Sequence, residues 1–311
     1  MSNILISGSI AYDQIMNFPD LFRNHFVADK LHNINVSFNV SEHNEHFGGT
    51  AGNIAYNLKL LGEKPQILAT AGKDFERYEK HLKALDIGTD SIHRNQEKST
   101  SFAYILTDQG DNQISGFHLG AGATPYGKFP VEDAVLAIIG PGNFDDMQKL
   151  PEACREAKVP FFFDPGQVIP MLPIETLQKG FEGAAAVFGN DYEFSMLSNR
   201  LGWSEKEMLE RTTMLVITLG EKGTRIVTKL EEKTVPAVIA REVVDPTGAG
   251  DSYRAGFIKG FIQKKTPEEC ARLGSTTAVY CVETGGTQEH RFSMDDVKTR
   301  YTENYRTSFP L

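Results

Sequence analysis

The sequence predicts an α/β protein with a mostly parallel central sheet, helices on both faces of that sheet, and a second, small β-sheet. Two observations carry this prediction. Short continuous apolar runs, which are typical of strands buried on both faces, alternate with amphipathic stretches of helical period. Two further segments, one strictly alternating in polarity and one resembling a hairpin, interrupt this pattern and indicate the additional sheet.

The apolar runs define the expected strands of the central sheet. They cover 4–6, 66–70, 135–139, 159–163, 184–188 and 214–218. Helices are expected between them: one opens at Asp74 and carries apolar residues from Phe75 to Leu85 on one side, and another begins at a capping box formed by Ser204 and Glu207.

Polar or glycine residues follow four of these strands directly. Because ligands of open α/β sheets bind beyond the carboxyl ends of the strands, these residues are expected to share one crevice. They are Gly8, Asp164, Asn190 and Gly220.

The small sheet is expected from three segments. Residues 33–41 alternate strictly between polar and apolar side chains, which predicts a half-exposed strand. Segments 101–107 and 113–118 flank a polar loop and predict a β-hairpin. We therefore assign 11–47 and 99–121 to a small β unit, and 1–10, 48–98 and 122–311 to the main domain. The small sheet could close over a ligand as a lid, or it could be an inert edge extension; an exposed sheet can also pair between two copies, which leaves a homodimer open.

The composition favours a small-molecule partner. The 311 residues carry a formal net charge of −9 and contain no block of Lys and Arg of the kind that binds nucleic acid, so we expect no nucleic-acid partner. The N-terminal residues lack the features of a secretory signal and no run reaches membrane-spanning length, which predicts a cytoplasmic protein without membrane association. The three cysteines are not at metal-ligand spacing and are expected to be reduced thiols.

The loop from Asp245 to Asp251, with the sequence Asp-Pro-Thr-Gly-Ala-Gly-Asp, points to phosphoryl transfer. Glycines at 248 and 250 allow the backbone N–H groups of Gly248, Ala249 and Gly250 to converge on an anion at a helix start. A carboxylate beside such a nest would repel phosphate, but it can accept the proton of an incoming hydroxyl. This interpretation makes Asp251 the general base, with a low pKa expected from its place at a helix N-terminus.

A second glycine cluster lies at 48–55 and has the spacing Gly-Gly-x-Ala-x-Asn-x-Ala, followed after six residues by Gly62 and after nine more by Gly72. This extended pattern resembles the first motif of the ribokinase-like (PfkB) carbohydrate kinases. The loop ending at Asp251, continued to Ile258, resembles their second motif. Further segments resemble the bacterial adenosine kinases of that family: 8–13, 31–40, 71–75, 190–193 and 284–289.

The resemblance implies a ribokinase-like fold and an ATP-dependent kinase that phosphorylates the 5′-hydroxyl of adenosine to give AMP. Asp13 would accept hydrogen bonds from the two vicinal hydroxyls of the ribose, and Asn53 would complete this recognition. Phe102 and Phe117 would sandwich the base, and Gln167 would hydrogen-bond it. The remaining residues implied on the substrate side are Ser9, Ser37, Gly48 and Gly49.

On the nucleotide side the resemblance implies ATP contacts at Asn190, Thr218, Gly220 and Gly223, with Glu193 holding Mg²⁺ through water. It puts the adenine of ATP near 284–288. Arg254 lies one helical turn after Asp251 and would reach either a transferring phosphate or a structural partner. Two other functions stay open: a kinase of the same fold for inosine, guanosine, ribose or fructose, and a nucleoside-binding regulator without turnover.

Overall fold

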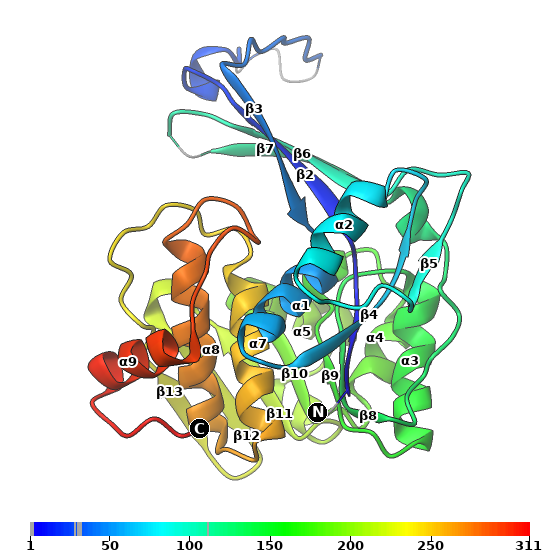
Figure 1. Cartoon of the computed structure of the whole chain (residues 1–311), viewed down its shortest axis with the longest axis vertical. Coiled ribbons are helices and arrows are strands. Elements are labelled where there is room, and N and C mark those ends of the chain that lie inside the picture. Colours follow the sequence, from blue (N-terminus) through cyan, green and yellow to red (C-terminus); the bar gives the residue numbers. More distant parts are fainter. Residues whose placement is uncertain (1–2, 28, 30–32, 111) are drawn as a thin grey trace.

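The computed structural model describes residues 3–27, 29, 33–110 and 112–311. A nine-stranded sheet occupies the body of the molecule, and a four-stranded sheet rises from one end of it (Figure 1). The predicted α/β architecture with a small lid sheet is confirmed.

The large sheet has the strand order β13-β12-β11-β10-β9-β8-β1-β4-β5, in which β12 and β13 are antiparallel to their neighbours and the other pairs are parallel. All six predicted strands are present. β5, β12 and β13 were not predicted because they are short or mix polar and apolar residues. The strands are β1 (Asn3–Ser7), β4 (Lys64–Ala71), β5 (Ile92–Arg94), β8 (Ala134–Ile139), β9 (Phe161–Phe163), β10 (Ala186–Asn190), β11 (Met214–Thr218), β12 (Thr224–Thr228) and β13 (Glu232–Val235).

Alternate residues of the central strands enter two separate cores, one on each face of the sheet. In β1, Ile4 and Ile6 pack on one side and Leu5 on the other, and all three are fully buried. Burial of one such side chain contributes about 1.5–3 kcal/mol, so both helical layers are held firmly to the sheet. The first core includes α1 (Thr50–Leu60), α2 (Glu76–Ala84), α7 (Ala249–Ile262), α8 (Pro267–Val282) and α9 (Met294–Tyr305). The second includes α3 (Phe144–Glu156), α4 (Ile174–Phe181), α5 (Asp191–Leu201) and α6 (Glu205–Leu209).

Two predicted helix starts have different outcomes. The capping box of Ser204 and Glu207 is present at α6. Asp74, in contrast, does not cap α2, which begins at Glu76 after Phe75. Its carboxylate instead accepts a hydrogen bond from the backbone N–H of Thr100 at 2.7 Å, so Asp74 ties α2 to the segment that enters the small sheet.

The lid sheet has the order β3-β2-β6-β7, with β2 (Ala11–Asn17), β3 (Glu42–Gly48), β6 (Ser101–Thr107) and β7 (Gln113–His118). β2 and β6 are parallel, whereas β2–β3 and β6–β7 are antiparallel. The hairpin of β6 and β7 matches the prediction, and Asp111 in its loop lies outside the described residues. β2 and β3 were not recognised because charged and amide side chains interrupt any apolar alternation in them.

The predicted strand at 33–41 is wrong. These residues have no regular secondary structure, and β3 begins only at Glu42. The reason is that Phe38 packs into an aromatic cluster, with its ring centroid 4.8 Å from Phe18 and 5.2 Å from Phe22. Of the alternating apolar residues, Phe38 enters this cluster, whereas Ile34 and Val40 are exposed and form no buried face of a sheet. Residues 31 and 32 of the segment 31–40 lie outside the described residues.

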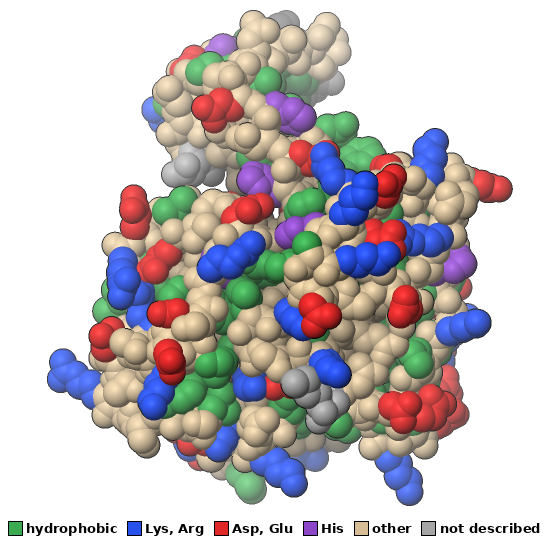
Figure 2. Space-filling model, viewed as in Figure 1, with side chains coloured by type: hydrophobic (Ala, Val, Ile, Leu, Met, Phe, Trp, Pro, Cys, Tyr) green, Lys and Arg blue, Asp and Glu red, His purple; other side chains and the backbone are tan. Residues whose placement is uncertain are grey.

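The lid sheet stands above the body as a separate lobe in the space-filling view, and on this face Lys and Arg side chains are interspersed with Asp and Glu (Figure 2). Within the described ranges, none of the helices is long and apolar enough to cross a membrane. Cys154, Cys270 and Cys281 are buried and form no disulfide.

Candidate active site

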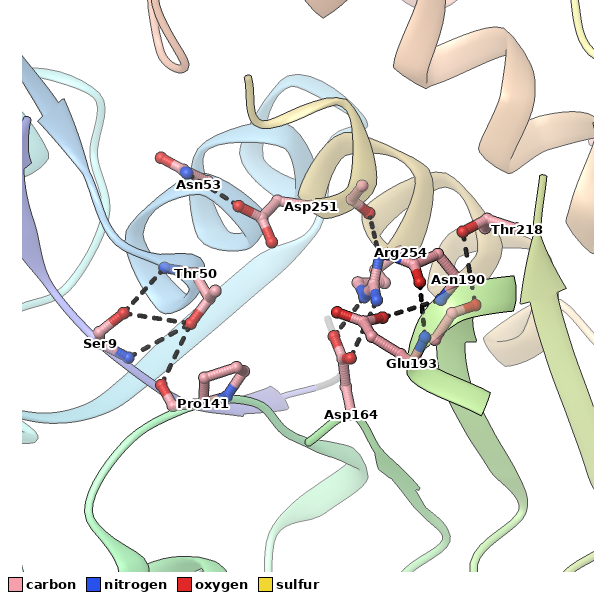
Figure 3. A network of polar contacts seen from close by, with 12 residues as sticks. Ser9, Thr50, Asn53, Pro141, Asp164, Asn190, Glu193, Thr218, Asp251 and Arg254 are labelled. Atoms are coloured by element: carbon pink, nitrogen blue, oxygen red, sulfur yellow. Dashed lines mark hydrogen bonds and ion pairs between the residues drawn. The ribbon is translucent and has the colours of Figure 1, made fainter. Parts of the chain in front are cut away.

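A cavity of about 680 Å³ lies where the carboxyl ends of the central strands meet the first turns of α1 and α7, below the lid sheet. Of the residues that follow predicted strands, Asp164, Asn190 and Gly220 line this cavity, as expected. Gly8 lies just behind it, where a Cβ would come within 2.7 Å of Thr50 Oγ1. Ser9 reaches the cavity and exchanges hydrogen bonds with Thr50, whose hydroxyl also donates to Pro141 O at 3.4 Å (Figure 3).

The loop from Asp245 to Asp251 leads into α7 beside this cavity. Gly248 is the N-cap of α7 with φ +79°, a left-handed conformation that favours glycine, and a Cβ there would lie 2.9 Å from Thr287 Cγ2. Asp245 fixes the loop by accepting from the N–H groups of Thr247 at 2.9 Å and Gly286 at 3.1 Å.

The three glycine-loop amides are not equivalent. Gly248 and Gly250 line the cavity. The N–H of Ala249 donates to Pro246 O at 3.2 Å, and Ala249 borders a neighbouring cavity. An anion in the first cavity would therefore meet the amides of Gly248 and Gly250 at the helix start, where backbone N–H groups lack helical partners.

Asp251 lies in the first turn of α7 and faces the cavity. Asn53 of α1 donates from Nδ2 to Asp251 Oδ2 at 2.8 Å, so two helices far apart in sequence meet at this carboxylate (Figure 3). The surrounding protein raises the pKa of Asp251 to about 6, through burial foremost, although Arg254 and the Asn53 hydrogen bond lower it. The low pKa expected from the helix N-terminus is wrong because desolvation outweighs it.

Asp13 faces the same cavity from β2. It is 9 % exposed, and no hydrogen bond among the described residues engages its carboxylate. Burial, together with the nearby charges of Asp251 and Asp245, raises its pKa to about 7. Gly48 lies against it, since a Cβ at that position would overlap the carboxylate. The next residue, Gly49, has φ +85° and begins α1 at the cavity wall.

Arg254 has a structural partner. It forms a two-pronged ion pair with Asp164, in which Nε bonds Oδ2 and Nη2 lies 2.9 Å from Oδ1 (Figure 3). Its Nη1 also donates to Gly250 O at 2.9 Å. The pair is buried, with side-chain exposures of 9 % for Arg254 and 3 % for Asp164, yet both residues border the cavity. Arg254 therefore anchors the first turn of α7 to the end of β9.

Asn190 and Glu193 form a capping box at the start of α5, with reciprocal hydrogen bonds of 2.8 Å between side chains and backbone N–H groups (Figure 3). Both also line the cavity. Burial and the charge of Asp164 raise the pKa of Glu193. Within the described ranges, no group of three or more His, Cys, Asp or Glu residues is arranged to hold a metal ion, so a cation here would take few protein ligands.

A second cavity of about 800 Å³ adjoins the first and shares Thr218, Gly220 and Gly250 with it. Gly223, in the turn after β11, lines this second cavity. Further walls come from the stretch before the glycine loop, from α8 and from residues around β12 and α7. They are Glu221, Lys222, Thr224, Ala237, Val238, Ile239, Ala240, Val243, Pro246, Ala249, Tyr253, Ser275, Ala278, Val279 and Val282. The loop 284–288, where the resemblance puts adenine, does not line it. Sequence reasoning singled out Gly220 and Gly223, but no motif marks 237–243 or the α8 residues, and their part in this cavity was missed.

Three comparisons identify the family. The model of the pfkB family of carbohydrate kinases matches residues 9–292. The chain belongs to this family.

It is 34 % identical over 304 residues to a nucleoside kinase of Methanocaldococcus jannaschii, covering 96 % of this chain and 97 % of the relative. Among solved structures, it is similar to the nucleoside kinase of Burkholderia thailandensis in complex with inosine, with 35 % identity, a TM-score of 0.88 and coverage of 98 % and 99 % of the two chains. The structure of the Methanocaldococcus jannaschii nucleoside kinase, described as an archaeal member of the ribokinase family, gives a TM-score of 0.85 with 32 % identity, covering 97 % of this chain and 99 % of that one. The ribokinase-like fold is thereby established.

In this pfkB-family kinase the lid does not bring together the two phenylalanines expected to sandwich a base. In the hairpin, Phe117 pairs with Ala103, whereas Phe102 pairs with His118. Because successive residues of a strand point to opposite faces, Phe117 faces the cavity and Phe102 faces away from it. Phe117 lines the cavity together with Ala103 and Ile105. The ring of Phe102 instead packs near Tyr104 and His118, with centroids 5.1 and 4.9 Å away. The expected sandwich is therefore wrong for Phe102.

Of the other residues expected to bind the substrate, two line the cavity and one does not. Ser9 and Gln167 line the cavity, the latter from a short 3-10 helix, Gly166–Val168, that follows β9. Ser37 is exposed in the irregular segment before β3 and does not reach the cavity. Gln288, expected only as part of the loop near adenine, is buried behind Asn53 and bonded to it, a contact that sequence reasoning missed.

Proposed function

We propose that this protein is an ATP-dependent nucleoside kinase that transfers the γ-phosphoryl group of ATP to the ribose 5′-hydroxyl of a purine nucleoside. Adenosine is the acceptor that the sequence first suggested, and AMP would be its product. Inosine is the second candidate, supported by the inosine complex of the similar Burkholderia thailandensis kinase. In this proposal the enzyme acts in the cytoplasm in purine salvage.

The observation that carries the proposal is the pairing of two carboxylates with one anion nest. Asp13 and Asp251 share a cavity with the helix-start amides of Gly248 and Gly250. Two vicinal hydroxyls suit a carboxylate that is free to accept hydrogen bonds, and the Asp13 carboxylate has no such partner among the described residues. A bare anion-binding site would gain nothing from either carboxylate, which argues against a regulator without turnover.

In the proposed reaction Asp251 removes the proton of the 5′-hydroxyl, the hydroxyl oxygen bonds to the γ-phosphorus, and the bond to the β–γ bridging oxygen breaks to release ADP. With Oδ2 of Asp251 accepting from Asn53, Oδ1 is the oxygen left to receive the proton. The amides of Gly248 and Gly250 stabilise the charge on the transferring group. Since the hydroxyl loses its proton late in a loose transition state, positioning contributes more than basicity.

ATP is proposed to occupy the second cavity and to extend its phosphates past Thr218 and Gly220 into the first. Asn190 and Glu193 would hold Mg²⁺ through water, because a half-buried carboxylate with a raised pKa gains from a cation beside it. Bound there, Mg²⁺ would neutralise phosphate charge.

We further propose that segments 11–47 and 99–121 close as a lid over the nucleoside, with Phe117 stacking on the base from one side only. Gln167 would hydrogen-bond the base. A homodimer formed through the lid stays part of the proposal as an alternative use of its exposed edges.

One assay tests the acceptor. ATP consumption is measured with adenosine, inosine, guanosine, ribose and fructose under the same conditions. The proposal expects the highest kcat/KM with a purine nucleoside. A preference for ribose or fructose would reject the nucleoside assignment, and ATP consumption with none of the five would reject the function.

A further inference from the structure

Asp251, the proposed general base, is held by a series of side-chain hydrogen bonds that runs behind the cavity and ends on the lid. From Asp251 it passes to Asn53 of α1, then to Gln288, which follows α8, and then to Tyr78 of α2. Tyr78 OH donates to Gly48 O, the last carbonyl of lid strand β3, at 2.8 Å. Asn53, Gln288 and Tyr78 are 4 %, 1 % and 0 % exposed, so no solvent replaces these contacts.

The donor and the acceptor of each hydrogen bond in this series can be assigned from the group at its lid end. A backbone carbonyl can only accept, so Tyr78 must donate to Gly48 O and must accept from Gln288. The Gln288 amide nitrogen is the only group of that side chain that donates, and it lies 2.6 Å from Tyr78 Oη and 3.0 Å from Asn53 Oδ1. Because Asn53 Oδ1 is thereby engaged, the Asn53 NH₂ group must face Asp251.

His81 holds Gln288 from the other side. Its Nε2 lies 3.0 Å from Gln288 Oε1, an acceptor, so the imidazole donates there. Burial lowers the pKa of His81, which favours the neutral ring. The ring stacks on Phe47 of β3 with a centroid distance of 4.0 Å, and Thr287 Oγ1 donates to Phe47 O at 2.7 Å. Tyr78, His81 and Thr287, which surround Gln288, thus contact the end of β3 at three points.

We propose that Gln288 is a positioning residue that fixes the rotamer and amide orientation of Asn53, and through it the orientation of Asp251, in register with lid strand β3. Gln288 touches neither cavity, so its effect on phosphoryl transfer is indirect. The inference rests on the proposed role of Asp251 in the reaction, and it moves Gln288 away from the adenine contact that the loop 284–288 first suggested.

The test compares Gln288→Met with the wild type and with Gln178→Met, a matched change on α4 outside the site. Gln288→Met keeps the length of the side chain but removes its donors. We expect kcat at pH 7 to fall about tenfold or more, because the base is less well oriented. We also expect the acid limb of the kcat profile to move up by about half to one pH unit, because the hydrogen bond from Asn53 lowers the pKa of Asp251.

A second pair of variants tests the proposal if Gln288→Met does not fold. His81→Phe keeps a ring on Phe47 but removes the donor to Gln288, and His81→Gln provides a donor again. We expect a smaller fall in kcat and the same direction of pH shift for His81→Phe, with most of the loss restored in His81→Gln. The charged and titratable groups around Asp251 are unchanged in all variants: Asp13 on β2, Tyr78 on α2, Asp164 after β9, Arg254 on α7 and Cys281 on α8.

Wild-type kcat and pH profiles in both Gln288→Met and His81→Phe would overturn the proposal. The acceptor panel keeps this failure separate from failure of the nucleoside assignment. If the wild type phosphorylates a sugar and no nucleoside, the nucleoside assignment fails, and the same comparison with that sugar still tests Gln288.

Discussion

Arg254 Nη2 lies 2.9 Å from Asp164 Oδ1, and the pair joins the first turn of α7 to the end of β9 beneath the cavity. A buried carboxylate that loses its cation is strongly destabilising, typically by about 3–5 kcal/mol. The position of Arg254 one helical turn after Asp251 therefore has a structural reason in this ion pair.

Arg254→Ala should lower the thermal stability of the protein, as measured by its unfolding temperature. Removing the charge of Asp164 as well should recover part of the loss, so Asp164→Asn combined with Arg254→Ala is expected to be more stable than Arg254→Ala alone. If Arg254→Ala leaves both kcat and the KM for ATP unchanged, a phosphate contact by Arg254 is rejected.

Asp251→Asn should abolish most turnover while leaving nucleoside binding. The loss of a general base costs roughly 10²–10⁴-fold in kcat, whereas Asp13 and Asn53 are untouched. Calorimetric titration with adenosine or inosine measures binding, and ATP consumption measures turnover. Turnover close to that of the wild type would remove Asp251 from the role of base.

The same carboxylates should make the protein without ligand less stable as the pH rises. Their pKa values are raised from 3.8 to about 7 for Asp13 and about 6 for Asp251. A raised pKa means that folding favours the protonated form, so this contribution to stability is complete below about pH 4 and is lost as the pH passes through 6 and 7.

Asp13→Asn should therefore be more stable than the wild type at pH 8, by about 1–3 kcal/mol, and the difference should shrink at pH 5. Because Asp13 and Asp251 are coupled, the gains from Asp13→Asn and Asp251→Asn are not expected to add. Chemical denaturation at pH 8 and pH 5 measures the free energy of unfolding of each variant and of the wild type. Equal stability of Asp13→Asn and wild type at pH 8 would contradict the proposed cost of the buried charge.

Phe117 and Phe102 lie on opposite faces of one hairpin and give a test residue and its control for the proposed stacking on the base. Phe117→Ala should raise the KM for a purine nucleoside about 5- to 150-fold, from the loss of about 1–3 kcal/mol of stacking, and should leave any turnover of ribose unaffected. Phe102 lies on the opposite face of the same hairpin. Phe102→Ala should therefore reduce the stability of the protein without changing the preference for nucleoside over ribose. A selective effect of Phe102→Ala would contradict the face assignment.

Features of the fold that leave a local pattern in the sequence could be predicted, and features that depend on distant contacts could not. Continuous apolar runs predicted the strands that lead to Asp164, Asn190 and Thr218, because burial on both faces of a sheet leaves a direct trace in the sequence. β3 leaves no such trace, since its side chains from Glu42 to His46 are polar. The Asp251 pKa could not be predicted because the helix N-terminus is visible in the sequence and the degree of burial is not.

The sequence was enough to predict that Phe102 and Phe117 lie on opposite faces of the hairpin. A hairpin whose strands end at Thr107 and begin again at Gln113 fixes the register, and that register pairs Phe102 with His118. The bonds of Gln288, in contrast, depend on four segments meeting in space, and no periodicity records them.

Gly48→Ala tests how tightly the end of β3 fits the acceptor site. A Cβ at Gly48 would overlap the Asp13 carboxylate, so Asp13 must turn away from its place in the cavity. We expect the KM for the nucleoside to rise by at least about tenfold, because the carboxylate proposed to bind the ribose is displaced, while the KM for ATP stays near the wild-type value. Gly116→Ala, on β7 of the same sheet with open space around its Cβ, is the control. An unchanged nucleoside KM in Gly48→Ala would show that Asp13 does not bind the ribose from the position it occupies.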